Sequence, residues 1–354
     1  MKSSLVSLSL YFGNNGHVND TTEKNVAAPR ELPLWTNYVD WLLLSLIVFV
    51  FAFYQILGES RDWQSYDDFF ELLRVEGTDS LGISRFEPGF VIVGLILTKL
   101  LSANLAVYGM IAASVMFCKC WVINQFSANR IIFFIVTLFY FIHFVPLHEL
   151  TQLRVACSAT FLLLAFVLLG RNNRLVGLAA CAVALAFHLS AIVVSPFLFI
   201  KSSSRRTVIL VSVIVFIATL FGVGQVTSYF QDSIGVVKMY QEAGFGDQIP
   251  NPLSSAMLLD WGMIVAGLFI WDRLSLSMKH VILLELVGMA IFYASMDFAV
   301  ISHRIRELLS VFWIFFVAEG LQQELLVKQI SILFVITSLI LYSYLFVFSG
   351  QFFI

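Results

Sequence analysis

Long runs of apolar residues, without charge except for Glu285 in one of them, constrain the fold of this chain more than any other feature. They cover residues 41–57, 90–98, 104–117, 131–145, 156–170, 175–187, 190–200, 207–226, 261–271, 281–294, 308–318 and 331–353. Of the 354 residues, 59% are hydrophobic and 12% are charged, whereas a soluble domain has about 25% charged residues. So little charge could not cover a surface in water, which excludes a soluble enzyme. The sequence predicts an all-α, polytopic integral membrane protein.

The lysines and arginines between these runs predict the orientation, because cytoplasmic loops are enriched in both. The main clusters are Arg171/Arg174, Lys201/Arg205/Arg206 and Arg273/Lys279. The clusters Arg171/Arg174 and Lys201/Arg205/Arg206 can both lie on the cytoplasmic side only if residues 175–200 fold back at His188–Ser190. Lys119 and Arg130 share that side only if residues 90–101 lie as a half-inserted periplasmic helix. We then predict about eleven crossings, with the N-terminus inside and the C-terminus outside.

One transmembrane domain is expected over residues 37–354, after a cytoplasmic N-terminal tail at residues 1–36. Two long outer segments interrupt this domain, at residues 58–103 and 225–252. The first is rich in acidic residues. A net charge of −2 offers no basic footprint, so we predict no nucleic-acid partner.

Several polar and charged residues are expected at one level, the outer face. They are Arg61, Asp62, Tyr66, Asp67, Glu87, Gln152, Arg154, His188, Arg304 and Glu307. Each lies in the first outer segment, at the fold-back or where an apolar run begins. Charges at a membrane are costly and mark functional sites. We interpret them as an outward-opening polar cavity roofed by the acidic segment.

The residue types in this cavity predict transfer of a group away from a phosphate. Arg154 and Arg304 lie near helix starts, where guanidinium forks and the helix N-terminus both favour a diphosphate. A carboxylate such as Asp62, Asp67 or Glu87 could accept a proton from a hydroxyl nucleophile. The alternatives are that the arginines anchor lipid headgroups and that exposed cations pair with nearby acids.

Two further expectations concern His188 and metals. His188 either takes part in the chemistry or satisfies backbone groups where a helix breaks. The Asp67-Asp68 pair supplies too few oxygens for a hard cation. We therefore predict no metal site and no cofactor.

Five short motifs, in this order, resemble the EpsG family. They are Arg61-Asp62 with Tyr66, Glu87-Pro88-Gly89-Phe90, Gln152-Leu153-Arg154-Val155-Ala156, His188-Leu189-Ser190-Ala191, and Arg304-Ile305 with Glu307. The resemblance runs from about residue 40 to about residue 320. The usual family pattern has Arg-Gln before the alanine of the third motif, whereas here Gln152 precedes Arg154 by two positions. The first hydrophobic segment common in the family is shortened here to residues 1–12.

The resemblance implies a Wzy-like polymerase of bacterial capsule, exopolysaccharide or O-antigen. It implies a fold similar to the GT-C membrane glycosyltransferases. These carry a large first outer loop with a catalytic acid, a periplasmic helix before the second span, and short fifth and sixth spans. The implied location is the bacterial inner (cytoplasmic) membrane, with the active site facing the periplasm.

We therefore expect a glycosyltransferase that joins undecaprenyl-diphosphate-linked oligosaccharide repeats without a metal. Other expected partners are membrane lipids and a chain-length regulator. The catalytic candidates are Arg154, Asp62, Glu87 and His188, and the substrate-binding candidates are Arg61, Tyr66, Asp67, Gln152, Arg304 and Glu307. The enzymatic alternative is an O-antigen ligase or acyltransferase acting on the same glycans. The other alternative is a flippase or transporter of lipid-linked sugars, which would distribute charges through the membrane depth and show an internal repeat.

Overall fold

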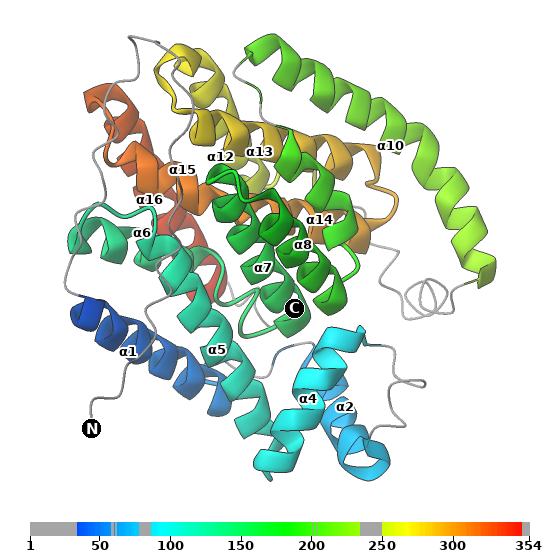
Figure 1. Ribbon diagram of the computed structural model, residues 1–354. Coiled ribbons are helices and arrows are strands. Elements are labelled where there is room, and N and C mark those ends of the chain that lie inside the picture. The colour runs from blue at the N-terminus through cyan, green and yellow to red at the C-terminus, as the bar shows by residue number, and fades with distance from the viewer. Residues whose placement is uncertain are drawn as a thin grey trace.

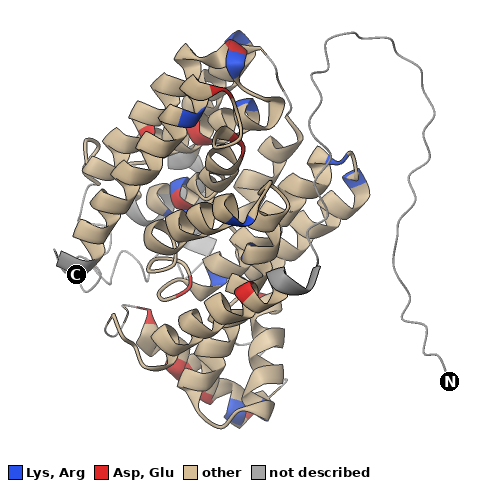
Figure 2. Ribbon diagram, turned by 90° about the vertical axis from the view of Figure 1, so that its left-hand side faces the viewer, with Lys and Arg blue, Asp and Glu red and all other residues tan. Residues whose placement is uncertain are grey.

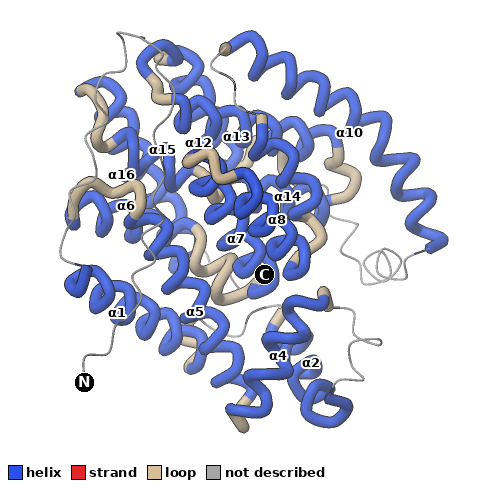
Figure 3. The backbone as a smooth tube through the Cα atoms, viewed as in Figure 1, coloured by secondary structure: helices blue, strands red, loops and turns tan. Residues whose placement is uncertain are grey.

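The described part of the chain is built from helices, with no strand in it (Figures 1 and 3). The computed structural model describes residues 34–57, 60, 62–77, 86–200, 202, 204–233 and 250–348. The α-helices are α1 Leu34–Phe53, α2 Trp63–Glu76, α4 Pro88–Leu100, α5 Asn104–Asn124, α6 Arg130–His143, α7 Leu153–Gly170, α8 Arg174–Phe187, α9 Ala191–Val194, α10 Arg205–Ser233, α12 Ser255–Phe269, α13 Leu276–Ala294, α14 Ala299–Ser310, α15 Trp313–Gly320 and α16 Leu325–Ser343. Short 3₁₀ turns follow α9 at Ser195–Phe199 and α12 at Trp271–Arg273, and a π-helical turn at Tyr344–Phe348 follows α16.

Five of these helices are long and apolar enough to cross a membrane. They are Asn104–Asn124, Leu153–Gly170, Arg205–Gly222, Leu276–Ala294 and Leu325–Phe346. Five shorter apolar helices of 10–17 residues accompany them, at Tyr38–Phe53, Pro88–Leu100, Arg130–His143, Arg174–Phe187 and Ser255–Phe269. Charged residues are sparse over most of the helical surface (Figure 2). The helical membrane-protein class is thus supported, while about eleven crossings and the GT-C arrangement remain predictions.

Helices α7 and α13 form the interior, and α10 lies at one edge (Figure 1). The spanning windows of α7 and α13 are each 72% buried, whereas that of α10 is 11% buried. After Arg206, the exposed large side chains of the described part of α10 are apolar, such as Leu210, Ile214 and Phe221. This is the pattern of a helix that faces lipid, since lipid tails are as apolar as leucine.

The chain reverses direction after α8. His188 at the end of α8 lies beside the start of α7, because both His188 and Arg154 contact Glu87. Residues 191–199 then run toward the other end of α7. His280 shows this, since its Nε2 lies 2.9 Å from the carbonyl oxygen of Phe197 and its ring lies 5.1 Å from that of Phe166. The chain therefore folds back at His188, as the positions of the cationic clusters predict. Which side of the membrane the two ends of this segment face stays a prediction.

Helices α2 and α4 lie side by side at one end of the molecule (Figure 1). Tyr66, Phe69, Phe70 and Leu73 follow a helical period along α2 and are all buried. This face packs on the aromatic start of α4, where Phe90 is fully buried. With 13 residues, α4 is shorter than the about 20 needed to cross. A half-inserted α4 therefore stays the prediction.

Two cations lie in different surroundings from those that we expected. Lys119 was predicted at the inner surface, but its side chain is fully buried and pairs with Glu149. Arg306, two residues after Arg304 in a segment expected at the outer face, is buried and pairs with Asp260. Each of these two cations pairs with a carboxylate inside the protein and so is not a loop cation, while the membrane side of each remains a prediction. Arg130 keeps a 59% exposed side chain and pairs with Asp40.

The predicted domain boundaries fall partly outside the described residues. Helix α1 begins at Leu34, three residues before the expected boundary. Residues 1–33 of the expected tail are not among those described, nor are residues 78–85 and 234–249 of the two outer segments. The single transmembrane domain remains an expectation.

Candidate active site

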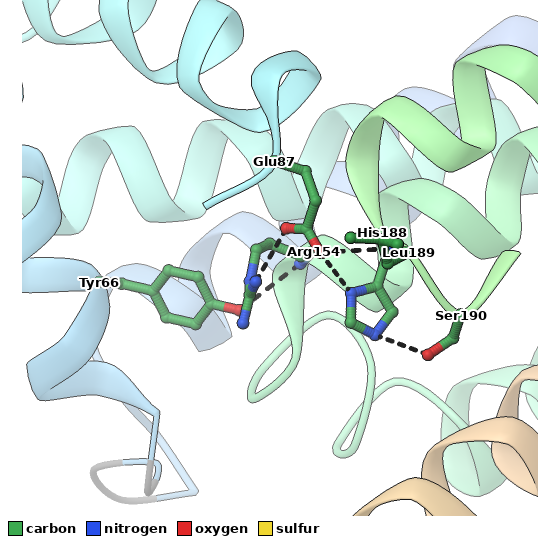
Figure 4. A network of polar contacts seen from close by, with 6 residues as sticks. All are labelled: Tyr66, Glu87, Arg154, His188, Leu189 and Ser190. Atoms are coloured by element: carbon green, nitrogen blue, oxygen red, sulfur yellow. Dashed lines mark hydrogen bonds and ion pairs between the residues drawn. The ribbon is translucent and has the colours of Figure 1, made fainter. Parts of the chain in front are cut away.

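The candidate site forms where the start of α4, the start of α7 and the end of α8 meet (Figure 4). Glu87 precedes Pro88, the first residue of α4, and has the extended backbone that a residue before proline prefers (φ −66°, ψ 148°). Gly89 lets α4 approach α8 closely, because a Cβ at Gly89 would lie 2.7 Å from the carbonyl oxygen of Ala186. A larger residue at this position would push Glu87 away from His188.

The Glu87 carboxylate joins two cationic or titratable groups. Its Oε2 accepts a hydrogen bond of 2.8 Å from Arg154 Nη1. Its Oε1 lies 3.0 Å from His188 Nδ1 and accepts a 3.3 Å hydrogen bond from the backbone N–H of Leu189. One carboxylate therefore orients both the guanidinium and the imidazole, as Figure 4 shows.

The protonation states of this pair follow from burial and neighbouring charge. Burial by itself would raise the pKa of Glu87, but the hydrogen bond from His188 and the charge of Arg154 prevail and lower it to about 2. Burial lowers the pKa of His188 below 6.5, and Glu87 opposes only part of that effect. At neutral pH Glu87 is ionised and His188 is neutral. A neutral imidazole that donates from Nδ1 to a carboxylate has its Nε2 lone pair available as a base.

Ser190 and Tyr66 complete the described cluster. Ser190 Oγ lies 3.3 Å from His188 Nε2, where a hydroxyl can donate to that lone pair. Tyr66 OH accepts a long hydrogen bond of 3.5 Å from the backbone N–H of Arg154. Burial raises the pKa of Tyr66 to about 12, although Arg154 and Arg304 act in the opposite direction. Tyr66 thus keeps its proton and can donate it.

Arg154 combines several sources of positive potential. It lies in the first turn of α7, where backbone N–H groups favour anions. Its guanidinium carbon lies 4.6 Å from the centre of the Phe86 ring, which holds the plane of the fork. Its side chain is 17% exposed, so that it is accessible to a ligand. Arg304 adds charge nearby, since it lowers the pKa of both Tyr66 and His188.

The other predicted residues lie around this cluster or away from it. Gln152 Nε2 lies 3.5 Å from Glu307 Oε2, which links the start of α7 to α14. Asp62 acts on the pKa of Tyr66 and is therefore close to it. Asp67 points away, since its carboxylate accepts a 2.8 Å hydrogen bond from Asn104. Arg61 lies outside the described residues.

Sequence reasoning did not assign roles to Phe86 and Ser190, although both are immediate neighbours of predicted residues. The signals that could have found them are the aromatic residue directly before Glu87-Pro88 and the serine two positions after His188. Sequence reasoning also missed a buried cluster of Lys119, Tyr140 and Glu149. Among the described residues, no group of three His, Cys, Asp or Glu side chains is arranged to hold a metal ion.

A model of the EpsG family matches residues 40–352, nearly the whole chain. The chain belongs to the EpsG family. This is a family of Wzy-like polymerases, so that membership confirms the resemblance and implies a polymerase-like role in polysaccharide biosynthesis. Comparison with curated proteins gives no match, and comparison with solved structures gives none either.

Proposed function

We propose that this EpsG-family protein is a glycosyltransferase that polymerises lipid-diphosphate-linked oligosaccharide repeats at the periplasmic face of the bacterial inner membrane. The donor is the growing glycan on undecaprenyl diphosphate, and the acceptor is a single lipid-linked repeat. The observation that carries the proposal is the Glu87 carboxylate, which orients both a phosphate-binding group, Arg154, and a neutral base, His188. Both of these groups are needed for this transfer.

In the reaction, a hydroxyl oxygen of the acceptor sugar attacks the anomeric carbon of the donor. The bond between that carbon and the phosphate oxygen breaks, and the lipid diphosphate leaves with the electron pair. The hydroxyl proton passes to Nε2 of His188. Ser190 Oγ, which now lies 3.3 Å from that nitrogen, marks the position that the acceptor hydroxyl would share or take.

Arg154 is proposed to stabilise the charge that develops on the leaving diphosphate, where oriented donors contribute most. A guanidinium has five N–H donors in a planar fork that matches phosphate oxygens in geometry, and its Nη1 is oriented by Glu87. Arg304 and Tyr66 are proposed as further donors to the same group. Glu87 acts through its neighbours rather than as the base, because its pKa of about 2 makes it a weak proton acceptor.

The glycan pattern of a deletion strain tests this function against its alternatives. Loss of a polymerase should leave glycans that carry a single repeat. Loss of a flippase should remove the surface glycan altogether. Loss of an O-antigen ligase should leave polymer that is not attached to lipid A-core. Either of the last two patterns would contradict the polymerase assignment.

A further inference from the structure

A second polar cluster involves Glu149, in the turn that leads into α7. Lys119 Nζ donates to Glu149 Oε1 at 2.7 Å, and the Tyr140 hydroxyl donates to the same oxygen at 2.6 Å. Lys119 Nζ also lies 2.5 Å from the Tyr140 hydroxyl oxygen. Lys119, Tyr140 and Glu149 are all fully buried. Three segments meet here, namely α5, α6 and the turn at residues 144–152 that leads into α7.

Stability alone does not explain an ion pair at such a place. Removing two charges from water costs several kcal/mol per ion, and apolar residues of similar volume are often as stable or more so. Lysine in a helix that is apolar enough to span a membrane is especially costly. The ion pair instead fixes the position of a carboxylate, because two donors bond to the same carboxylate oxygen. Here that group is Glu149.

The turn that carries Glu149 is tied to the start of α7 by its own backbone. The N–H of Glu149 donates to Val145 at 3.1 Å, and the N–H of Gln152 donates to His148 at 3.0 Å. The N–H of Ala156 then donates to Gln152 at 2.9 Å, which continues into the helix. A displacement of Glu149 is therefore passed on to the first turn of α7.

The N-cap residue of α7 does not fix the first turn with its own side chain. Gln152 is the N-cap residue, and its side chain makes no capping hydrogen bond. Arg154 lies two residues further, five residues after Glu149. We propose that Lys119 and Tyr140 are positioning residues, which hold Glu149 and thereby fix the turn that presents Arg154 and Gln152 to the diphosphate of the substrate. The role toward the diphosphate rests on the proposed function.

Hydrogen exchange of the purified, full-length protein in detergent micelles measures the turn independently of what the protein synthesises. The main variant is the double substitution Lys119→Met with Glu149→Leu, which leaves no single buried charge and so should still accumulate in the membrane. We expect the amides of residues 147–156 to exchange about tenfold faster than in the wild type, while those of α13 keep their protection. Tyr140→Phe should produce a smaller change in the same amides.

The matched control is Arg130→Gln, which breaks a cation–carboxylate pair whose arginine is 59% exposed. It should leave exchange at residues 147–156 unchanged. Wild-type exchange at these residues in the double variant would overturn the proposal. Faster exchange there, together with shortened glycan chains at normal protein abundance, would support it. Faster exchange with wild-type chain lengths would contradict the part that concerns Arg154.

The two proposals fail in different ways. If the deletion strain shows the pattern of a lost flippase or ligase, the polymerase assignment fails. The exchange comparison would still decide whether Lys119 and Tyr140 fix the turn.

Discussion

The two ends of residues 149–154 belong to two clusters of closely similar chemistry. The site cluster contains Glu87, Arg154 and His188, and the buried cluster contains Lys119 and Glu149 with Tyr140. In the site cluster the side chains of Arg154 and Glu87 are 17% and 10% exposed. In the buried cluster both ionic partners are 0% exposed. Each cluster holds a cation, a carboxylate and a nearby tyrosine, so the difference lies in access.

Access decides which cluster can bind a ligand. A partly exposed guanidinium can exchange water for phosphate oxygens, and its fork matches them in geometry. A fully buried ammonium already has its acceptor, and exposing it would require opening three packed segments. We therefore propose that the site cluster carries the chemistry and that the buried cluster positions it. The following predictions test that division, from the largest expected effect to the smallest.

The largest effect is expected at Arg154. Arg154→Ala should reduce polymerisation by about 10²–10³-fold, which is typical of removing one donor to a developing charge. Arg154→Lys keeps the charge but loses the fork, so it should retain weak polymerisation. Glycan length in a complemented deletion strain measures both, with protein abundance measured in the same membranes. Single-repeat chains at normal abundance are the expected result for Arg154→Ala.

Arg273→Ala is the appropriate control for Arg154. Arg273 pairs with Glu324, and both side chains are more than half exposed, which makes this pair worth little. Arg74, in the acidic segment, is a less suitable control, because its Nη2 donates to the carbonyl of Leu101 at the end of α4. Its removal would disturb the packing of α4. Long glycans in Arg154→Ala would remove this residue from the site.

The next effect concerns the pH dependence through Glu87 and His188. Since the neutral form of His188 is the base and its pKa lies below 6.5, activity should be constant above that value. It should fall as the pH drops through the folded pKa and His188 gains a proton. Glu87 raises the pKa of His188, so Glu87→Gln should move this acid limb to lower pH as well as lower the plateau. A purified enzyme assayed across pH would show it; a limb that moves to higher pH would contradict the assignment.

The two tyrosines provide a smaller and sharper comparison. Tyr66→Phe should reduce polymerisation several-fold at unchanged protein stability, because the hydrogen bond that Tyr66 OH accepts from Arg154 N–H is long, at 3.5 Å. Tyr140→Phe should instead lower the free energy of unfolding by about 1–3 kcal/mol, since it removes a donor to a buried charge. Thermal melting in detergent and glycan length separate the two effects. The reverse pattern would show that the buried cluster, not the site cluster, contacts substrate.

The last prediction leaves activity unchanged and tests which side the site cluster faces. In a Cys118→Ser background, Gln64→Cys on the exposed face of α2 should react with an impermeant reagent added from outside. Asn172→Cys and Ser202→Cys should not react, because the positive-inside rule predicts that both ends of residues 174–200 lie on the inner side. Labelling at Ser202 but not at Asn172 would show that this segment crosses once.

The sequence by itself determined the class of this protein and its family, and it singled out polar residues that the structure brings together. These properties depend on composition and on charge next to apolar runs, which are local. They led to Glu87, Arg154 and His188, and to a chain reversal at His188–Ser190. The family motifs led to the same residues.

The tertiary structure decided which charges meet. Lys119 and Arg154 are each a cation beside or within an apolar run, and nothing local distinguishes them. Lys119 bonds to a carboxylate 30 positions along the chain, and Arg154 to one 67 positions away. Asp67 and Glu87 are both carboxylates in the acidic segment. Asp67 nevertheless bonds to Asn104, whereas Glu87 pairs with Arg154 in the site. Partners so distant in sequence are selected by helix packing, such as the close approach that Gly89 allows, and burial then determines whether a charge binds substrate or holds the fold.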